Sequence, residues 1–354
     1  MRYLHGGHGW PFFSARGRPA AIGPCCDHQQ RSGTGPSANH RPDGQAARNA
    51  VARRTGQKCP PAQLEKAAGA LRPAFFVGGA APASVSDAEV IHALEAGQFL
   101  VYYQPKFTLQ DLQVDSLELL ARWNHPRLGL LSPSRFLPTL ERLGLLDRLL
   151  HQQIDQCLHF RQQAKTYGFD FKFSINIQTF QLASEGLFDA VSTRLRAFDT
   201  PGTCLCFEMT ETDAQTLTPM NLENLVRLRM LGCVLSIDDF GAGHSSLQRL
   251  CTLPFNEIKL DGLFVRELNA TSRSGVAITS TLQIADALGI DVVIEGIETQ
   301  EQRTQLINLG CRLGQGYYFA MPMPATKLLV WLFNKVFQDY LSTVRRRLLS
   351  LPPP

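Results

Sequence analysis

Short apolar runs that end in a polar side chain recur along the second half of the chain. Each run contains β-branched or aromatic residues, and a segment with helical periodicity follows it, so the pattern predicts a series of βα units. Five runs end in residues that bind cations or carry charge: K-F-S-I-N at Asn176, C-L-C-F-E at Glu208, V-L-S-I-D-D at Asp238 and Asp239, N-E-I-K at Lys259, and V-V-I-E at Glu295.

The residues before these units predict a different opening. Residues 87–96 have a helical pattern, and the segments 99–106 and 114–123 are close enough in sequence to pair as an antiparallel hairpin. Ser132 followed by a proline is typical of a helix start, and this helix is expected to end near Gly144. Further strands are expected at 171–176, 204–209, 233–238, 257–260, 291–295 and 314–319, and further helices at 146–167, 185–198, 221–231, 244–250, 276–288 and 300–309.

About eight strands with helices between most of them favour an α/β fold of the (β/α)₈ barrel type over an open sheet. In this architecture the carboxyl ends of the parallel strands lie on one face. The polar side chains that end the apolar runs are therefore expected to converge at the mouth of the barrel.

The residue types at this mouth indicate a metal site. An isolated Asp-Asp pair is usually a solvated acidic turn, but the repeated pattern favours a functional site over that interpretation. Oxygen donors without a cysteine or histidine among them suit Mg²⁺ or Mn²⁺ better than zinc or copper. The lysine adds a charge that would stabilise an anionic transition state or orient a water molecule.

Composition sets the class of protein. The chain has 354 residues, 44% of them hydrophobic, which is enough for a barrel-sized core. Nine cysteines without Cys-x-x-Cys spacing favour reduced thiols and a cytosolic location, and Cys204 and Cys206 are expected to pack as small apolar side chains. No stretch approaches the roughly 20 apolar residues of a membrane span, and the N-terminus lacks the apolar region of a signal peptide.

The net charge of +4 is unevenly distributed. Residues 1–84 carry eleven Lys or Arg against three acids, with twelve Gly and nine Pro, so this segment is expected to be disordered. A basic arm could touch nucleic acid or a membrane surface, but an unstructured extension is the favoured interpretation, and direct nucleic-acid binding is not expected. From residue 325 an amphipathic helix is expected, and the arginines at 345–347 fit a C-terminal cap better than a nucleic-acid patch.

Motifs between residues 87 and 330 resemble the EAL domain, a bacterial phosphodiesterase domain that acts on the second messenger cyclic di-GMP. Glu118 in S-L-E-L-L-A-R-W matches the signature glutamate, and Leu119 replaces the alanine of the family name. Eight further motifs occur in family order: Y-Y-Q-P-K, R-W-N-H-P, F-S-I-N, F-E-M-T-E, S-I-D-D-F-G-A-G-H-S-S-L, L-P-F-N-E-I-K-L-D, V-V-I-E-G-I-E-T and L-G-Q-G-Y-Y-F.

The resemblance implies a modified TIM barrel with an antiparallel first strand, a domain at 85–330, a C-terminal helix and tail at 331–354, and a homodimer. It implies hydrolysis of cyclic di-GMP to linear pGpG with two Mg²⁺ or Mn²⁺ ions, and through this the regulation of gene expression, motility, biofilm formation or virulence. The implied metal ligands are Glu118, Asn176, Glu208, Asp238 and Asp239, the catalytic residues Lys259 and Glu295, the substrate contacts Gln104 and Arg122, and the supporting residues Glu211, Glu298 and Gln315.

Two alternatives remain open for the substrate contacts: Arg122 could form an ion pair at the barrel edge, and Gln104 could bond only to backbone. The sequence also departs from the family pattern at four places, Gln178, Ala242, His244 and Met321. These departures keep a second hypothesis open, a catalytically weak cyclic di-GMP receptor or protein-interaction regulator of gene expression. The intact set of acidic residues favours the active phosphodiesterase.

Overall fold

The structure of the chain is a computed structural model that describes residues 85–349 apart from 216, 242–246, 267 and 269–272. The disorder predicted for residues 1–84 lies outside the described residues. The same is true of the departures from the family pattern at Ala242 and His244.

A long hairpin follows the first helix of the described part. β1 (Phe99–Thr108) pairs antiparallel with β2 (Val114–His125), with Gln104 opposite Glu118. Leu112, in the turn between them, has a positive φ of 55°, which lets the chain reverse direction. A third strand, β3 (Gly129–Leu131), extends the hairpin by pairing antiparallel with the end of β2.

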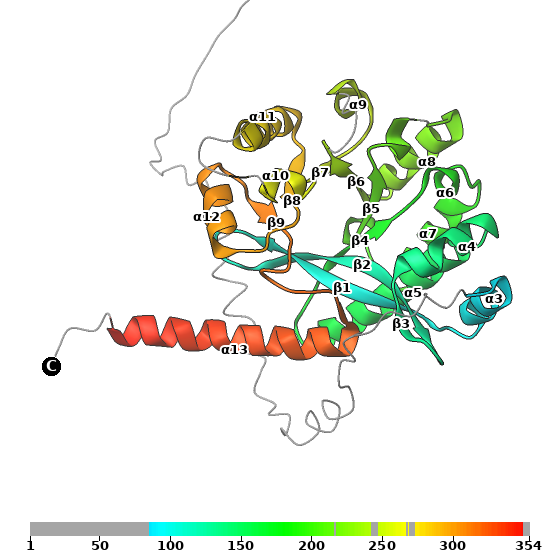
Figure 1. The fold of residues 1–354 in the computed structure, drawn as a ribbon, viewed down its shortest axis with the longest axis horizontal. Helices are drawn as coiled ribbons and strands as arrows, with labels where there is room; N and C mark the ends of the chain where they lie inside the picture. Colours follow the sequence, from blue (N-terminus) through cyan, green and yellow to red (C-terminus); the bar gives the residue numbers. More distant parts are fainter. Residues whose placement is uncertain (1–84, 216, 242–246, 267, 269–272, 350–354) are drawn as a thin grey trace, which may run out of the picture. The chain divides into compact units, whose positions relative to one another are not determined.

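Seven parallel strands and one antiparallel strand form a closed barrel (Figure 1). β1 pairs antiparallel with both β2 and β9, and this double pairing closes the ring. The antiparallel first strand and the barrel predicted from the sequence are therefore confirmed. The remaining strands are β4 (Lys172–Asn176), β5 (Leu205–Thr210), β6 (Val234–Phe240), β7 (Glu257–Leu260), β8 (Asp291–Ile294) and β9 (Leu313–Gly314), with β10 (Met323–Pro324) antiparallel to the outer edge of β1.

Helices occupy most of the connections between these strands (Figure 1). Among the residues that the structure describes, no helix combines the length and apolar composition that crossing a membrane requires. The described helices are α3 (Asp87–Glu95), α4 (Leu137–Arg142), α5 (Leu146–Thr166), α6 (Thr179–Leu182), α7 (Leu187–Ala197), α8 (Pro219–Met230), α9 (Leu247–Thr252), α10 (Leu263–Arg266), α11 (Arg273–Leu288), α12 (Gln300–Asn308) and α13 (Ala325–Leu349).

Local sequence fixes several helix starts. Ser86 accepts from the backbone of Glu89 while the Glu89 side chain accepts from the backbone of Ser86, a reciprocal capping box. Thr218 and Thr299 cap α8 and α12 in the same way. Pro219 at the first position of α8 needs no hydrogen-bond acceptor there.

Two apolar cores lie outside the barrel interior. The larger one packs the outward side chains of the strands, such as Phe173, Phe207 and Ile258, against the surrounding helices. The smaller one packs the start of the hairpin against α3 and α4, with the ring of Phe99 5.4 Å from that of Trp123 and 4.8 Å from that of Phe136. Since apolar side chains point outward, the inward positions are free to carry polar groups.

Some predicted elements are wrong in extent. The strand expected at 314–319 ends at Gly314, and the residues after it form turns. The helix expected from Pro133 is a short 3₁₀ turn followed by α4, and the Ser132 hydroxyl contacts Ser134 instead of capping. The helix α13 runs without a break across residue 330, and the domain boundary expected there stays a prediction.

Gly316 explains why the last strand stops early. A Cβ atom at Gly316 would lie 2.0 Å from the backbone oxygen of Ile297 and 2.4 Å from its nitrogen. The chain therefore passes directly against the residues that follow β8, which the backbone bonds from Ile297 to Gln315 and from Tyr318 to Ile297 also require. Only glycine fits at this position.

We predict that Gly316→Ala lowers the free energy of unfolding by about 1–3 kcal/mol, because the added methyl group forces the two backbone segments apart. Urea unfolding followed by circular dichroism measures the loss. Gly186→Ala is the matched control, since no atom lies within 4 Å of the added methyl group there. Equal stability of the two variants would contradict the packing argument.

Candidate active site

The ammonium group of Lys259 lies at the centre of the predicted site. Its side chain comes from β7 and is 1% exposed. Its Nζ lies 2.8 Å from Glu295 Oε1, 2.9 Å from Asp238 Oδ1, 3.0 Å from Glu208 Oε2 and 3.5 Å from Glu118 Oε2. The structure thus brings five of the predicted site residues into one network. Glu118 comes from the interior of β2, and the others come from the carboxyl-terminal halves of β5, β6 and β7 and from the residue after β8.

Two glutamines hold Glu118 in this network. Gln315, just after β9, donates from Nε2 to Glu118 Oε2 at 2.5 Å and to Gln104 Oε1 at 3.2 Å. Gln104 in turn donates to the backbone oxygen of Ala320 at 3.2 Å. All three polar side chains are buried, so this chain of hydrogen bonds joins the two strands of the opening hairpin to the last barrel strand.

The loop after β6 depends on Glu211. Its Oε2 accepts from the backbone of Gly241 at 3.0 Å, and its own backbone N–H donates to the oxygen of Asp238 at 3.1 Å. Asp239 has a positive φ of 55°, a strained conformation for a non-glycine residue. Its backbone N–H donates to Asp238 Oδ1 at 3.0 Å, so the two adjacent carboxylates are held at one turn.

The other predicted site residues lie around the network. Asn176 is exposed and pairs in register with Glu208 on the neighbouring strand, and both line a cavity of about 300 Å³. Arg122 lies over the ring of Tyr102, with its guanidinium carbon 5.6 Å from the ring centroid, and donates to the backbone of Ala121. The Glu298 side chain is exposed at the start of α12, and it is not one of the four carboxylates that contact Lys259.

The charges in this network shift one another's protonation. Burial favours the neutral form of Glu208, but Lys106 and Lys259 outweigh burial and lower the pKa of Glu208 to about 2. Burial raises the pKa of Glu295 to about 8, with Asp238 and Glu118 adding to the effect and Lys259 opposing it. Burial also raises the pKa of Asp238. The pKa shifts within this one cluster are therefore opposite: the charged form of Glu208 is favoured, and the neutral forms of Glu295 and Asp238 are favoured.

Burial favours the neutral form of Lys259, yet the four carboxylates around it raise its pKa well above the ordinary value. The lysine therefore stays charged at all ordinary pH values. The barrel interior holds five carboxylates, those of Glu118, Glu208, Asp238, Glu257 and Glu295, against the two ammonium groups of Lys106 and Lys259.

This excess of carboxylates fits a divalent cation. Asp238, Asp239 and Glu295 each offer a carboxylate oxygen within 4.8 Å of the others. Such hard oxygen donors suit Mg²⁺ or Mn²⁺. The described residues thus contain an acidic cluster that could hold a metal ion at the mouth of the barrel.

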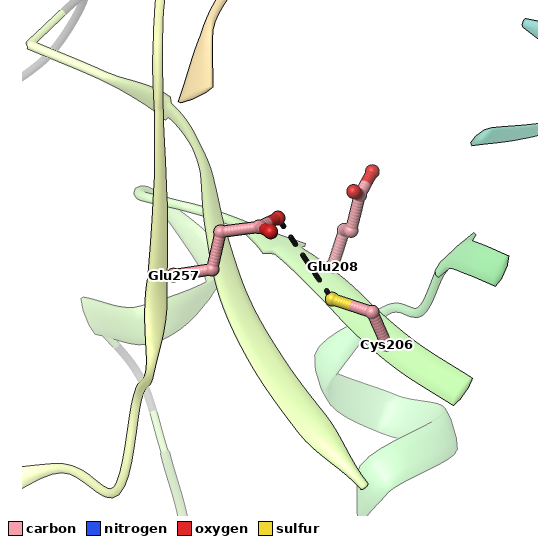
Figure 2. Close-up of side chains that lie close together, drawn as sticks. All are labelled: Cys206, Glu208 and Glu257. Carbon is pink, nitrogen blue, oxygen red and sulfur yellow. Dashed lines mark hydrogen bonds between the residues drawn. The ribbon is translucent and has the colours of Figure 1, made fainter. Parts of the chain in front are cut away.

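A second acidic cluster, which was not predicted from the sequence, lies deeper in the barrel. Figure 2 shows Cys206 and Glu208 on one strand, with the carboxylate of Glu257 on another strand turned toward Cys206. The Cys206 thiol lies 3.9 Å from Glu257 Oε1 and burial raises its pKa well above the ordinary value. The expectation that Cys206 packs as an apolar side chain is wrong, because inward positions on this strand face charged groups.

Lys106 is the other residue that sequence reasoning missed. It is 1% exposed and donates to Glu208 Oε1 at 2.6 Å. The signal for it was its position two residues after Gln104, which places both side chains on the inner face of β1. A lysine on the inner face of a largely apolar strand indicates a charged partner inside the barrel, since lysines are rarely buried without one.

Comparison with known proteins places the chain in a family. A profile of the EAL domain matches residues 87–322. The chain belongs to the EAL domain family. Two curated relatives from Pseudomonas aeruginosa are the cyclic di-GMP phosphodiesterase RocR, 46% identical over 239 residues, and the bifunctional diguanylate cyclase/cyclic di-GMP phosphodiesterase MucR, 35% identical over 238 residues.

The matches cover 68% of this chain and 61% of RocR, and 67% of this chain and 35% of MucR. The chain therefore spans about three fifths of one relative and about a third of the other. A solved structure of the PaMucR phosphodiesterase in a c-di-GMP complex superposes with a TM-score of 0.63 at 34% identity. The superposition covers 68% of this chain and 98% of the chain in that structure, so the EAL barrel accounts for the similarity.

Two departures from the family pattern lie within the described residues. Gln178 precedes α6, and its backbone N–H donates to Gln181 Oε1 at 3.0 Å. Met321 is 60% exposed, so an apolar side chain is presented to solvent where the EAL pattern has a basic one. Neither residue contacts Lys259 in the network described above.

We predict that Glu295 makes the metal-free protein less stable as the pH rises from about 4.5 to about 8. In this range the unfolded state ionises Glu295 while the folded state keeps it protonated, so stability falls by at most about 1.4 kcal/mol per pH unit. Glu295→Gln should remove this part of the slope. Urea unfolding from pH 5 to pH 8 with a chelator measures it, and the exposed Glu185→Gln serves as control.

An unchanged slope in Glu295→Gln would contradict the assignment. Glu208 has the opposite sign, because its pKa is lowered in the folded state. Its contribution to stability is present above about pH 4.5 and is lost as the pH falls through about 2. The two carboxylates are therefore separable in one titration of stability.

Proposed function

We propose that this chain is a metal-dependent phosphodiesterase that hydrolyses cyclic di-GMP to linear pGpG. The observation that carries the proposal is the buried Lys259 ammonium with four carboxylates around it at the barrel mouth. Support also comes from membership of the EAL domain family and from relatives named as cyclic di-GMP phosphodiesterases.

The proposed metal ligands are the carboxylates of Glu118, Glu208, Asp238 and Asp239 with the amide of Asn176, for two Mg²⁺ or Mn²⁺ ions. Bound ions of this kind supply a hydroxide at neutral pH and neutralise charge on the reacting phosphate. The carboxyl groups of the barrel outnumber its two ammonium groups even when Glu295 is protonated, and this supports the assignment, since the interior then carries unbalanced negative charge until cations bind.

In the proposed reaction one P–O3′ bond of the cyclic substrate breaks. The oxygen of water becomes part of the 5′-phosphate, and the departing 3′ oxygen takes a proton. Lys259 adds positive charge where the phosphate becomes most negative. Glu295, 2.8 Å from the Lys259 ammonium, is positioned to accept the proton of the attacking water.

The remaining site residues hold this arrangement or contact the substrate. Gln315 and Gln104 fix Glu118, and Glu211 fixes the turn that carries Asp238. Arg122, whose guanidinium lies over Tyr102, is proposed to contact a guanine or a phosphate oxygen at the mouth. Glu298 keeps a proposed supporting role that needs a rearrangement of its exposed side chain.

We further propose that the enzyme works as a homodimer in the cytoplasm. The buried thiols of Cys157, Cys204, Cys233 and Cys311 are free, as a reducing compartment would keep them. Through the level of cyclic di-GMP the enzyme would regulate gene expression, motility, biofilm formation or virulence.

We predict that the purified full chain with Mg²⁺ or Mn²⁺ converts cyclic di-GMP to pGpG, and that a chelator abolishes the reaction. Product is separated by liquid chromatography. If the chain binds cyclic di-GMP without forming product, it belongs to the receptor class, and the phosphodiesterase proposal fails.

Lys259→Ala and Glu118→Ala should each lower kcat by about 100-fold or more, because each removes charge that acts on the reacting phosphate or its cations. Lys165→Ala is the matched control, since this lysine is 44% exposed on α5 and its ion-pair partner in the described part of the chain is Asp170, away from the site. Retention of wild-type kcat in either site variant would place the chemistry elsewhere.

A further inference from the structure

A second buried lysine lies deeper in the barrel, and the mechanism above does not use it. The Lys106 ammonium has three hydrogen-bond donors. It donates to Glu208 Oε1 at 2.6 Å, to Ser174 Oγ at 2.7 Å and to Glu257 Oε1 at 3.1 Å. All three donors are therefore used, each toward a different strand, so the position of the ammonium group is fixed from three sides.

The two oxygens of Glu208 accept from two different lysines. Lys106 bonds Oε1, and Lys259 bonds Oε2 at 3.0 Å. Glu208 is fully buried, so the pair of lysines fixes the plane of its carboxylate. Oε2 is the oxygen bonded to Lys259, whose ammonium group also contacts Glu118, Asp238 and Glu295. Outer partners of this kind commonly orient metal-ligating acids and tune the metal.

We propose that Lys106 is a positioning residue, a built-in cation that fixes Oε1 of Glu208 so that Oε2 is presented to the active site. This inference rests on the proposed function, because Glu208 is one of the proposed metal ligands. Lys106 acts only through Glu208 and contacts neither the substrate nor a metal ion.

The groups around Lys106 form a cation site that the lysine itself fills. Cys206, Glu208 and Glu257 offer ligand atoms within 4.8 Å of one another (Figure 2), and the ammonium bonds two of these three side chains. A polar cavity of about 260 Å³ at the other end of the barrel is lined by Ser174, Cys206 and Glu257. It gives a small cation a route to this place once the lysine side chain is removed.

The first experiment needs neither substrate nor metal. Lys106→Ala, held with a chelator, should have a lower Tm than the wild type, and added methylammonium should raise this Tm by filling the vacated site. Lys172→Ala is the matched control, because this exposed lysine lines the same cavity but, within the described residues, forms its ion pair with Asp115. Equal effects of methylammonium on the variant, the control and the wild type would overturn the cation site.

The second experiment separates positioning from simple stabilisation. Lys106→Met combined with Glu257→Gln removes the ammonium group and one of its counter-charges together. The free energy of unfolding should therefore fall less than in the single variant Lys106→Met. This double variant should have a near-wild-type circular dichroism spectrum and a kcat about 10- to 100-fold lower. Its KM for cyclic di-GMP should stay within about twofold, because the Lys106 side chain is 1% exposed and its ammonium group bonds only to buried side chains of the barrel.

A folded double variant with wild-type kcat would overturn the positioning role. Recovery of kcat in Lys106→Ala with methylammonium supports it, because a small ammonium ion then replaces the missing contact to Glu208. Failure of the proposed function appears separately, as absence of hydrolysis by the wild type. The Tm measurement on metal-free protein decides on the cation site in that case as well.

Discussion

The candidate active site depends on one buried positive charge, the ammonium group of Lys259. A charge taken out of water costs several kcal/mol unless opposite charges and hydrogen bonds replace the lost solvation. Four carboxylates, three from strands β2, β5 and β6 and one from the residue after β8, supply that replacement, and they in turn could not lie so close together without a cation between them. The lysine and the acids are therefore each a condition for burying the other, and the polar mouth of the barrel follows from this mutual dependence.

The alternation of side chains along each strand makes this polar interior possible. On β5, Leu205 and Phe207 point into the outer apolar core, while Cys206 and Glu208 point inward. Because the apolar contacts that hold the barrel together lie between strands and helices, the inside can hold charge without loss of the main core. Lys106 and Glu257 extend the charged region downward from the mouth into the middle of the barrel.

The sequence predicts most of the barrel and most of the network, for a physical reason. The last residues of parallel strands lie on one face of the barrel. An apolar run that ends in Asp238, Glu208 or Lys259 therefore predicts both the strand and the position of its polar side chain. Lys106 could not be predicted in this way, because it lies between Pro105 and Phe107 in the interior of an antiparallel strand and not at the end of a strand.

Other features depend on contacts between distant segments and leave no local pattern. The last barrel strand stops early because Gly316 packs against Ile297, a contact that a window of neighbouring residues cannot reveal. Short elements such as β10 and α6 contain too few residues for a period to appear. Glu298 matches a family motif, yet its side chain is exposed, since a motif fixes the residue type and not its orientation.

Closure of the ring through β1 also sets an order of events in folding. Thr108 pairs with Leu313, so the first and last strands of the barrel meet across almost the whole domain. Joining segments so far apart in sequence carries a large loss of chain entropy before any contact is gained. On a ribosome the hairpin emerges early, but its second edge stays unpaired until nearly the complete domain has been synthesised. Gln315, which bridges that last strand to Gln104 and Glu118, can complete the site only at this final step.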